Sequence, residues 1–376
     1  MSVLTLNCGS SSVKYSVFDT HNQAFSCRGI VERVGGPDCP NHTAAVERVL
    51  KDVSKENIRA VGHRVVHGGE KFKQSARVTP ELIRVVEEVA ELAPLHNPPN
   101  LAGIRAAQKL LPDVPHVAVF DTAFHQTMEP GAFLYPLPYE WYEKYGIRRY
   151  GFHGTSHLYV SARAAVLLGR PLAELKIVTL HVGNGASAAA VAGGKSQDTS
   201  MGFTPLEGLV MGTRCGWIDP AVPLYVMERE GLNTDQMDLV LNKQSGLLGI
   251  TGRFYDRRDI LKNAEAGDRR CRLALEIEAR SLKKTIGSYA AAMGGLDAVV
   301  FTAGVGENAP AIRARALAGL EFLGIHLDPR RNEKAVGGLG EETITTDDSP
   351  VKVLVIPTNE ALVIVEDTLA VLDLGA

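Results

Sequence analysis

Three short glycine-rich segments have the composition of phosphate-binding turns. They are Cys8–Ser12, Gly183–Ser187 and Ala303–Asn308, and each directly follows a hydrophobic run typical of a buried strand. Backbone N–H groups and small hydroxyls in such turns point at one place, which suits phosphate. One turn alone is weak support, because glycine also makes ordinary hairpins. The patterns G-x-x-x-x-G-K-[ST] and G-x-G-x-x-G are absent, so neither a P-loop nor a Rossmann nucleotide site is expected.

Two arginines and one aspartate lie where charge is useful for catalysis. Arg64 lies inside an apolar strand-like run, Arg214 lies between glycine-rich turns, and Asp121 follows the buried run Val117–Phe120. A planar guanidinium binds carboxylate or phosphoryl oxygens at two points. A strand-end carboxylate is more often catalytic or charge-orienting than solvated. A surface ion pair is the ordinary alternative for any single arginine, but the placement of these two favours anion binding.

Two histidine pairs have the i, i+4 spacing that chelates metal on a helix: His63 with His67, and His153 with His157. In a strand this spacing leaves both side chains on one face but too far apart to share a zinc ion easily. The glutamate of H-E-x-x-H is missing from both pairs. Zinc is therefore the minority interpretation.

The elements that must position these residues alternate between strands and helices, which favours an α/β architecture in two lobes. We expect strands at Val3–Asn7, Val13–Phe18, Ile177–His181, Ala298–Thr302 and Val351–Ile356. A further strand of small residues is expected after the Gly183–Ser187 turn, through Val191. We expect helices at Pro80–Leu92, Leu101–Leu111, Ser156–Leu168 and Ala264–Met293, after Pro310, and from Glu360 onwards. The strand–glycine turn–strand unit that begins at Val3 returns at Ile177, half a chain later. This repetition suggests a duplicated domain.

Length and composition exclude several classes of protein. The 376 residues suit two α/β domains, and 45% hydrophobic with 22% charged residues is the balance of a soluble globular protein. The net charge of −3 gives no general attraction to nucleic acid or to acidic membranes. The five scattered cysteines contain no C-x-x-C, which indicates reduced thiols in a cytosolic protein. We expect neither a signal peptide nor a membrane span.

A series of short motifs resembles the acetate kinase family in sequence and in order. They are Asn7–Lys14, Gly62–Gly69, Leu95–Pro99, Phe120–His125, Tyr150–His157, His181–Gly185, Met211–Gly216, Gly304–Asn308 and Pro357–Glu360. The resemblance implies an α/β fold of two duplicated actin-like (ribonuclease H-like) domains with an interdomain cleft. The expected domains are 1–124 plus 362–376, and 125–361, with the nucleotide site in the second.

The activity implied by the resemblance is reversible transfer of the γ-phosphoryl group of Mg-ATP to acetate, giving acetyl phosphate and ADP. Arg64 and Arg214 would neutralise the charge that gathers between a triphosphate and a carboxylate. His153, with Arg214, would stabilise the transferring phosphoryl group. Asp121 is expected to orient a nearby cation or a metal-bound water, because a carboxylate substrate needs no general base.

Binding residues also follow from the resemblance. Arg64 is expected to bind the carboxylate, and the alkyl group should meet Val66, Leu95, Phe152 and Pro205, which individually cannot be told from core residues. Magnesium, or manganese in its place, is assigned to Asn7 and Glu360. Phosphate contacts are expected from Ser12, Lys14, His181, Asn184 and Gly185. Ribose and base contacts are expected from Asp256, Arg258, Gly304, Val305, Gly306, Glu307 and Asn308, and Arg257 is expected to belong to the same nucleotide site.

Ordinary structural roles stay open for some of these positions. Lys14 could be an outward-facing strand residue, and Glu360 could be a first-turn helix residue favoured by the helix dipole. A structural hydrogen bond is as good an interpretation of His96 as a place near the carboxylate pocket. Two residues depart from the family pattern: Arg257 stands where an apolar residue is usual, and Trp217 stands where aspartate is common.

Rival functions are propionate kinase, a non-catalytic actin-like nucleotide switch and a metallohydrolase. One methylene changes discrimination in an apolar pocket by only about 1–3 kcal/mol, so residue types do not separate acetate from propionate. The expected partners are acetate and ATP, with no nucleic acid and no membrane. The family also implies a cytoplasmic homodimer.

Overall fold

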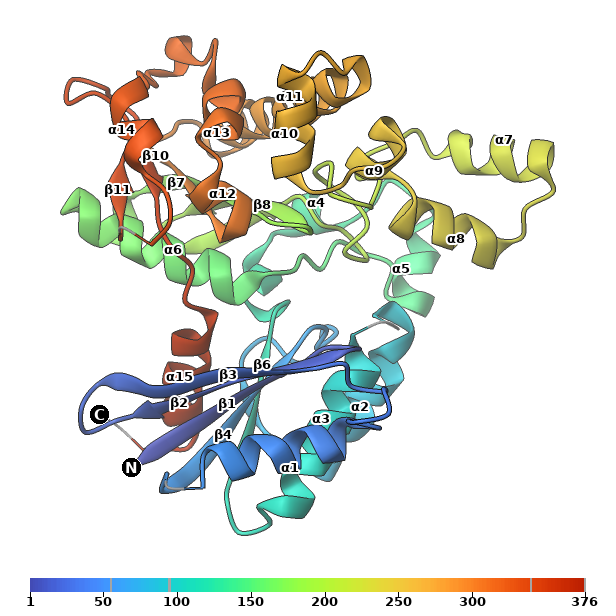
Figure 1. Cartoon of the computed structure of the whole chain (residues 1–376), viewed down its shortest axis with the longest axis vertical. Helices are drawn as coiled ribbons and strands as arrows, with labels where there is room; N and C mark the ends of the chain where they lie inside the picture. The colour runs from blue at the N-terminus through green and yellow to red at the C-terminus, as the bar shows by residue number, and fades with distance from the viewer. Residues whose placement is uncertain (55, 94–95, 339, 375–376) are drawn as a thin grey trace. The chain divides into compact units, whose positions relative to one another are not determined.

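The computed structural model of the chain describes residues 1–54, 56–93, 96–338 and 340–374. The chain divides into two compact units (Figure 1). Unit 1 contains residues 1–126, residues 152–155 and the C-terminal segment from Asn359, and unit 2 contains residues 127–151 and 156–358. The domain boundaries expected from the sequence, 1–124 plus 362–376 and 125–361, stay a prediction.

Unit 1 is built on a six-stranded mixed sheet with the order β3-β2-β1-β4-β6-β5. Its strands are β1 (Ser2–Cys8), β2 (Ser12–Asp19), β3 (Ala24–Glu32), β4 (Ile58–Val65), β5 (Ala76–Arg77) and β6 (His116–Phe120). Its helices are α1 (His42–Asp52), α2 (Pro80–Glu88), α3 (Asn97–Leu110) and α15 (Glu360–Val371), with 3₁₀ turns at Val89–Leu92 and Ala123–Thr127. The three central strands β1, β4 and β6 are parallel.

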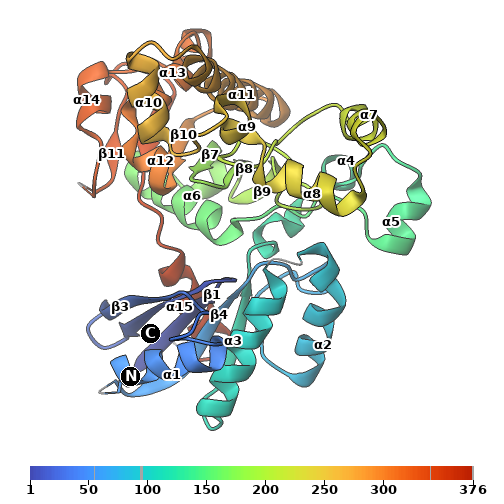
Figure 2. The same cartoon turned by 45° about the vertical axis from the view of Figure 1, so that its right-hand side comes forward.

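Helices cover both faces of the first sheet. Leu4 and Leu6 of β1 belong to a core cluster shared with α1 and α3, whereas Val3 packs with Val365 of α15 on the opposite face. Successive strand residues point to opposite faces, so this alternation is what a doubly covered strand requires. A Cβ at Gly62 of β4 would stand 2.4 Å from Thr368 Oγ1, so only glycine allows α15 to lie this close. Both views show this layering (Figures 1 and 2).

Unit 2 repeats the topology of unit 1. Its strands are β7 (Lys176–Val182), β8 (Ala186–Ala192), β9 (Lys195–Thr199), β10 (Ala298–Thr302), β11 (Glu342–Thr343) and β12 (Lys352–Val355). They form a sheet in the order β9-β8-β7-β10-β12-β11, and each neighbouring pair has the same parallel or antiparallel sense as its counterpart in unit 1. Ser2 and Lys176, the first residues of β1 and β7, are counterparts at the spacing the sequence repeat predicts. The expected duplication is confirmed.

The helices of unit 2 lie around the second sheet. They are α4 (Pro130–Phe133), α5 (Tyr139–Tyr145), α6 (Gly154–Leu168, whose first residues belong to unit 1), α7 (Ala221–Glu230), α8 (Thr234–Lys243), α9 (Gly246–Thr251), α10 (Arg257–Glu265), α11 (Arg269–Met293), α12 (Ala303–Asn308), α13 (Pro310–Leu317) and α14 (Pro329–Lys334). The 3₁₀ turns are Leu172–Glu174 and Glu321–Leu323. His157 of α6 bonds to Thr179 and Ser187 on one face of the sheet, and α11 covers the other face (Figure 2).

Two expectations about helices are wrong in detail. The single helix expected over Ala264–Met293 is two helices, because Gly267 has a left-handed φ of +101° and Asp268 caps the N-terminus of α11 with its side chain. The segment Ala303–Asn308 is the short helix α12 and not a turn. Its two glycines disfavour a helix locally, but packing of α12 against β7 and β10 overrides that preference.

Candidate active site

Polar side chains of unit 1 form a row across three neighbouring strands. Lys14 of β2 lies directly opposite Asn7 of β1 in the antiparallel register, so their side chains share one face. Leu6 pairs with His63 in the parallel register of β1 and β4, which brings Asn7 beside Arg64. The Arg64 Nη1 atom donates to Asn7 Oδ1 over 3.4 Å. Lys14 is exposed, and Ser12 begins β2 with its carbonyl accepting from the Gly9 N–H.

Arg64 forms a two-point ion pair with Asp121. Nε donates to Oδ1 over 3.0 Å and Nη2 donates to Oδ2 over 2.6 Å. The Asp121 side chain is 1% exposed and the Arg64 side chain 18%. Burial raises the pKa of the Asp121 carboxyl, and the Arg64 guanidinium opposes that shift. Burial lowers the pKa of Arg64, but Asp121 and Glu360 more than offset it, so that the pKa lies above its ordinary value. Both groups are therefore held as a tight ion pair.

The two residues assigned to magnesium both contact Arg64. Glu360 Oε2 lies 3.6 Å from Arg64 Nε and accepts from Thr155 Oγ1 over 3.4 Å. Asn7 offers an amide oxygen and Glu360 a carboxylate, which are the hard donors that magnesium prefers. Magnesium usually keeps several waters and takes only one or two protein ligands. This donor set fits the ion.

The backbone around Asp121 is fixed from two sides. Its N–H donates to the Val65 carbonyl over 3.0 Å, and its carbonyl accepts from the Gly154 N–H over 2.9 Å. The backbone of His153 hydrogen-bonds to the Asp121 carboxylate. His153 has a left-handed φ of 56°, which is uncommon for a residue other than glycine and concentrates at functional sites. The structure thus places the backbone of His153 beside the Asp121 carboxylate.

Two of the residues expected to meet the alkyl group, Val66 and Phe152, are buried, and Pro205 is half-buried. Val66 is 5% exposed and Phe152 is 1% exposed, both within unit 1. The ring of Phe152 packs edge-on against His67, with centroids 5.6 Å apart. Leu95 lies outside the described residues. His96 immediately precedes α3, where no side-chain cap is formed.

Two asparagines that the sequence reasoning missed hold the Val66 loop. Asn100 Oδ1 accepts from the Val66 N–H over 3.0 Å, and Asn97 Oδ1 accepts from the His67 N–H over 3.1 Å. Asn97 Nδ2 also donates to the His67 carbonyl over 3.0 Å, and both asparagine side chains are buried. The available signal was an asparagine pair at i, i+3 around Pro-Pro at the start of a helix, since buried polar residues there must bond to backbone.

The histidine pairs bond to protein groups within each unit. His63 Nε2 lies 2.9 Å from His116 Nδ1, and the two rings are stacked. His157 Nδ1 lies 2.7 Å from Thr179 Oγ1, and its Nε2 lies 2.8 Å from Ser187 Oγ. Burial lowers the pKa of His67 to about 3. Among the described residues, no three or more His, Cys, Asp and Glu side chains come together in a group that could hold a metal ion.

In unit 2 the counterpart of the Asn7 position is His181. It is the last residue but one of β7, and its Nδ1 lies 2.8 Å from Ser156 Oγ. Ser156 Oγ in turn accepts from Thr358 Oγ1 over 2.9 Å. The Thr358 N–H donates to Glu307 Oε1 over 3.1 Å. The predicted nucleotide residues His181 and Glu307 are thus linked through the hydroxyls of Ser156 and Thr358 and the Thr358 N–H.

The predicted phosphate turn follows β7. Gly183, Asn184 and Gly185 form a tight loop in which the Gly183 N–H donates to the Gly185 carbonyl over 3.0 Å. The Gly212 N–H donates to the Asn184 carbonyl over 3.0 Å. A Cβ at Gly212 would stand 2.0 Å from Asn184 Oδ1, so only glycine fits. This contact ties the phosphate turn to the loop that carries Arg214.

Arg214 is half-buried and differs from Arg64 in its partners. Its Nη1 donates to the Pro205 carbonyl over 3.1 Å and lies 3.6 Å from Met211 Sδ. Within the described ranges it makes no ion pair with a carboxylate, and burial lowers its pKa. The predicted residues Arg214 and Pro205 therefore lie together in unit 2, with positive charge that has not been neutralised.

Trp217, which stands where aspartate is common in the family, belongs to a polar cluster around Glu207. Trp217 Nε1 donates to Glu207 Oε1 over 3.2 Å, and Arg149 Nη2 donates to the same oxygen over 2.8 Å. Tyr135 hydroxyl bonds to the other Glu207 oxygen. An aspartate at 217 could not donate to Glu207, whereas the indole N–H does.

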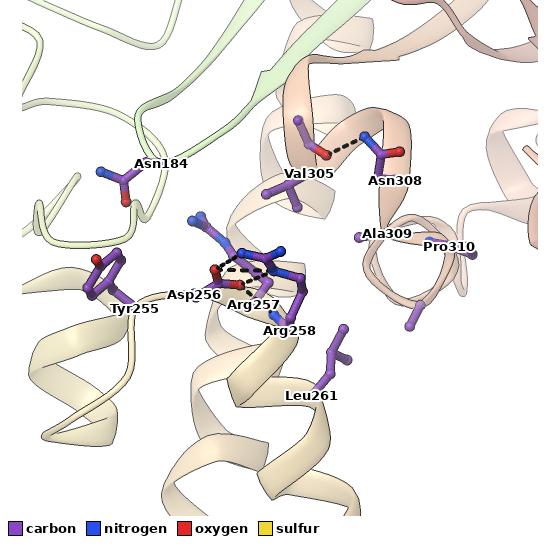
Figure 3. Close-up of a pocket in the computed structure, with 12 residues that line it drawn as sticks. Asn184, Tyr255, Asp256, Arg257, Arg258, Leu261, Val305, Asn308, Ala309 and Pro310 are labelled. Carbon is purple, nitrogen blue, oxygen red and sulfur yellow. Dashed lines mark hydrogen bonds and ion pairs between the residues drawn. The ribbon is translucent and has the colours of Figure 1, made fainter. Parts of the chain in front are cut away.

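A cavity of about 460 Å³ lies in unit 2 (Figure 3). Of the nucleotide residues predicted in this region, Gly306 and Glu307 are not part of its lining, which includes Asp256, Arg257, Arg258, Gly304, Val305 and Asn308. Asp256 caps α10 and pairs with Arg258, whose Nη2 lies 2.6 Å from Oδ2. Hydrogen bonds from Arg258 lower the pKa of Asp256 to about 2. Asn308 Nδ2 donates to the Gly304 carbonyl over 2.9 Å. The cavity thus joins α10 and α12 to the Asn184 turn, and an elongated ligand with an apolar part and a polar part would fit its lining.

Known proteins resemble this chain in sequence and fold along nearly its whole length. Residues 37–366 match the acetokinase family. The chain belongs to the acetokinase family. A protein of Trichlorobacter lovleyi named acetate kinase is 56% identical over 99% of this chain and 95% of its own length.

Two solved structures of family members have nearly the same fold. The crystal structure of Porphyromonas gingivalis acetate kinase has a TM-score of 0.94 at 46% identity, covering 99% of each chain. A propionate kinase from Francisella tularensis has a TM-score of 0.92 at 40% identity, covering 98% of this chain and 99% of its own. The expected family and the duplicated α/β fold are confirmed.

Proposed function

We propose that this protein transfers the γ-phosphoryl group of ATP to acetate, reversibly, giving acetyl phosphate and ADP. The observation that carries the proposal is that Arg64 donates hydrogen bonds to both carboxylate oxygens of Asp121, over 3.0 and 2.6 Å. A kinase that phosphorylates a hydroxyl needs a free carboxylate to take the proton. An aspartate held in this way is poorly placed to act as a base. An acceptor that is already an anion, such as a carboxylate, fits this arrangement.

The chemistry then needs positioning and charge neutralisation only. A carboxylic acid resembles a side-chain carboxyl, with a pKa of roughly 4 to 5, so acetate is ionised near neutral pH. One acetate oxygen attacks the γ-phosphorus, the bond to the β–γ bridging oxygen breaks, and ADP leaves. No proton is transferred. Arg64 binds the acetate, Arg214 and His153 stabilise the transferring phosphoryl group, and Asp121 holds Arg64 in place.

Magnesium belongs to this proposal through its donors. Asn7 and Glu360 would hold the ion, which supplies positive charge to the phosphate oxygens when it is bound. Because both residues contact Arg64, they would hold the ion beside the residue that we propose binds the acid. Manganese has the same preference for oxygen donors and would substitute for it.

The nucleotide is assigned to unit 2. The Asn184 turn, with His181 and Gly185, would take the phosphates, and Ser12 and Lys14 of unit 1 would contribute to them. The cavity of about 460 Å³ is of the size that small ligands occupy. Ribose and base would meet Asp256, Arg258 and the residues of α12, from Gly304 to Asn308. A non-catalytic nucleotide switch would have no use for Arg214, whose charge is not neutralised.

Propionate is the alternative acceptor, because a relative 40% identical to this chain is named a propionate kinase. Val66 and Phe152 would line the pocket for the alkyl group. One methylene alters discrimination by only about 1–3 kcal/mol, so both acids would react and their order is the question.

Subunit association and location complete the proposal. Helices α5 and α7 expose Tyr139, Tyr145, Leu224 and Tyr225, each at least 55% exposed. Large exposed apolar side chains of this kind are where we propose that a homodimer would form. All five cysteines are free thiols, which supports a reducing compartment such as the cytoplasm. Among the described residues, no helix meets the length and hydropathy required to cross a bilayer.

The test is incubation of the purified protein with Mg-ATP, hydroxylamine and a series of short acids. Hydroxylamine traps acyl phosphates as hydroxamates, which form coloured iron complexes. Colour with acetate above propionate and butyrate supports acetate kinase. Colour with propionate above acetate supports the alternative. If no acid in the series gives ATP-dependent colour, both assignments are contradicted.

A further inference from the structure

Arg257 forms an incomplete ion pair in the wall of the unit 2 cavity. The Arg257 side chain is 5% exposed and that of Glu278 is 2% exposed. Nε and Nη2 of Arg257 both donate to Glu278 Oε1, over 3.0 and 2.8 Å. Glu278 Oε2 is buried, and no hydrogen-bond partner for it is found in the described structure. A two-oxygen fork would bind more strongly, so this geometry is not the one that best stabilises the fold.

The third nitrogen of the guanidinium faces the phosphate turn. A Cβ at Gly212 would stand 3.5 Å from Arg257 Nη1 and 2.0 Å from Asn184 Oδ1, so these two polar atoms both lie beside the same glycine. Arg257 and Asn184 both line the cavity. In Figure 3 the Arg257 side chain extends from α10 toward Asn184, whereas Arg258 turns back to Asp256.

Nη1 is the available donor. The hydrogen bonds of Arg257 use Nε and Nη2, and in the described part of the chain no acceptor is recorded for Nη1. Because Glu278 fixes the other two nitrogens, the donor is pre-organised and loses little entropy on binding a ligand. Glu278 also cancels the charge, so the contribution is a directed hydrogen bond more than a general attraction for anions.

We propose that Arg257, held by Glu278, donates from Nη1 to a phosphate oxygen of the bound nucleotide and determines affinity for its diphosphate portion. The inference rests on the proposed function in that it takes a nucleotide as the ligand of the cavity. The position of Nη1 beside Asn184, and away from α12, selects phosphate over the nucleoside. Arg257 is a binding residue here, and Glu278 is a positioning residue.

The experiment measures binding of ADP and of adenosine by calorimetry, with magnesium and without any acid. Arg257→Lys keeps a charged partner for Glu278, but its single nitrogen cannot occupy both the position that pairs with Glu278 and the position of Nη1. The double variant Arg257→Met with Glu278→Leu removes donor and buried acid together, so that no unpaired charge is left. In both variants we expect ADP affinity to fall about 10- to 100-fold, as for hydrogen bonds to charged groups, and adenosine affinity to stay unchanged.

The matched control is Arg163→Met with Glu341→Leu, a two-point ion pair of unit 2 that does not line the cavity. Its ADP affinity should equal that of wild type. Unchanged ADP affinity in Arg257→Lys and in the double variant would overturn the inference, as would an equal loss of adenosine affinity. Wild type that binds ADP but makes no hydroxamate would count against the proposed function and leave the inference standing. Wild type that does not bind ADP would overturn the inference.

Discussion

Arg64 offers a direct way to separate catalysis from stability. In Arg64→Ala the buried Asp121 carboxylate loses both of its bonds to the guanidinium, at 3.0 and 2.6 Å. Breaking a buried pair by removing one partner typically costs about 3–5 kcal/mol in the free energy of unfolding. Removing one donor to a developing anion lowers kcat by about 100- to 1,000-fold. Both losses are expected in the single variant, so kcat alone would not identify the cause.

A double variant resolves this ambiguity. Arg64→Met with Asp121→Asn leaves no buried charge, so we expect it to recover most of the free energy of unfolding while kcat stays at least about 100-fold below wild type. Arg64→Lys should be stable but slow, because an ammonium cannot make the two-point contact. The surface counterpart is Arg163→Ala, which breaks a fork of 2.6 and 2.7 Å. Since that pair is partly exposed, its loss should cost about 1 kcal/mol or less, with normal kcat.

The pH dependence of unfolding gives a second readout. Burial already raises the pKa of Asp121, and Arg64 opposes the shift. Without Arg64 the pKa in the folded state rises further above that of the unfolded chain, so the folded state binds a proton that the unfolded chain releases. Stability of Arg64→Ala should therefore fall as pH rises. Urea midpoints at pH 5 and pH 7, together with initial rates of hydroxamate formation, measure all of these quantities.

Two results would refute this reasoning. Near-normal kcat in a folded Arg64→Ala protein would remove Arg64 from the mechanism. Recovery of kcat in the double variant would mean that Arg64 serves only to neutralise Asp121 and does not bind the acid.

Three further substitutions test neighbouring parts of the account. Arg214→Ala should lower kcat at least about 100-fold but shift the unfolding free energy by about 1 kcal/mol or less, because Arg214 pairs with no carboxylate in the described structure; normal initial rates would exclude it. Val66→Ala should raise the kcat/KM ratio of propionate to acetate by up to about 10- to 200-fold, and an unchanged ratio would place Val66 outside the pocket. Asp121→Asn should slow the enzyme without removing any ionisation from the kcat profile between about pH 6 and 8; if it erases one seen in wild type, Asp121 is a base.

Local sequence patterns were sufficient for the strands and for the duplication. Hydrophobic runs ending in glycine-rich turns correctly gave β1, β7 and β10. The placement of Arg64 inside an apolar run and of Asp121 after one was enough to expect a buried ionic site, because a charge there must be paired. The identity of the partners followed only from the sheet register.

What the sequence did not indicate depends on contacts between distant segments. Nothing near Arg257 in the chain reveals Glu278 as its partner on the next helix. The roles of Asn97 and Asn100 depend on where α3 meets the end of β4. The helix at Ala303–Asn308 forms against local propensity because it packs on the sheet. Tertiary packing decides each of these cases.

The central claim is that a carboxylate oxygen attacks the γ-phosphorus. Acetate labelled with ¹⁸O in both oxygens, incubated with Mg-ATP and the enzyme, tests it through the ³¹P NMR spectrum of the acetyl phosphate. The account predicts that the oxygen bridging carbon and phosphorus comes from acetate, so the phosphorus resonance should show the upfield isotope shift. An unshifted resonance would mean that a phosphate oxygen had attacked the acetyl carbon, and would contradict the mechanism.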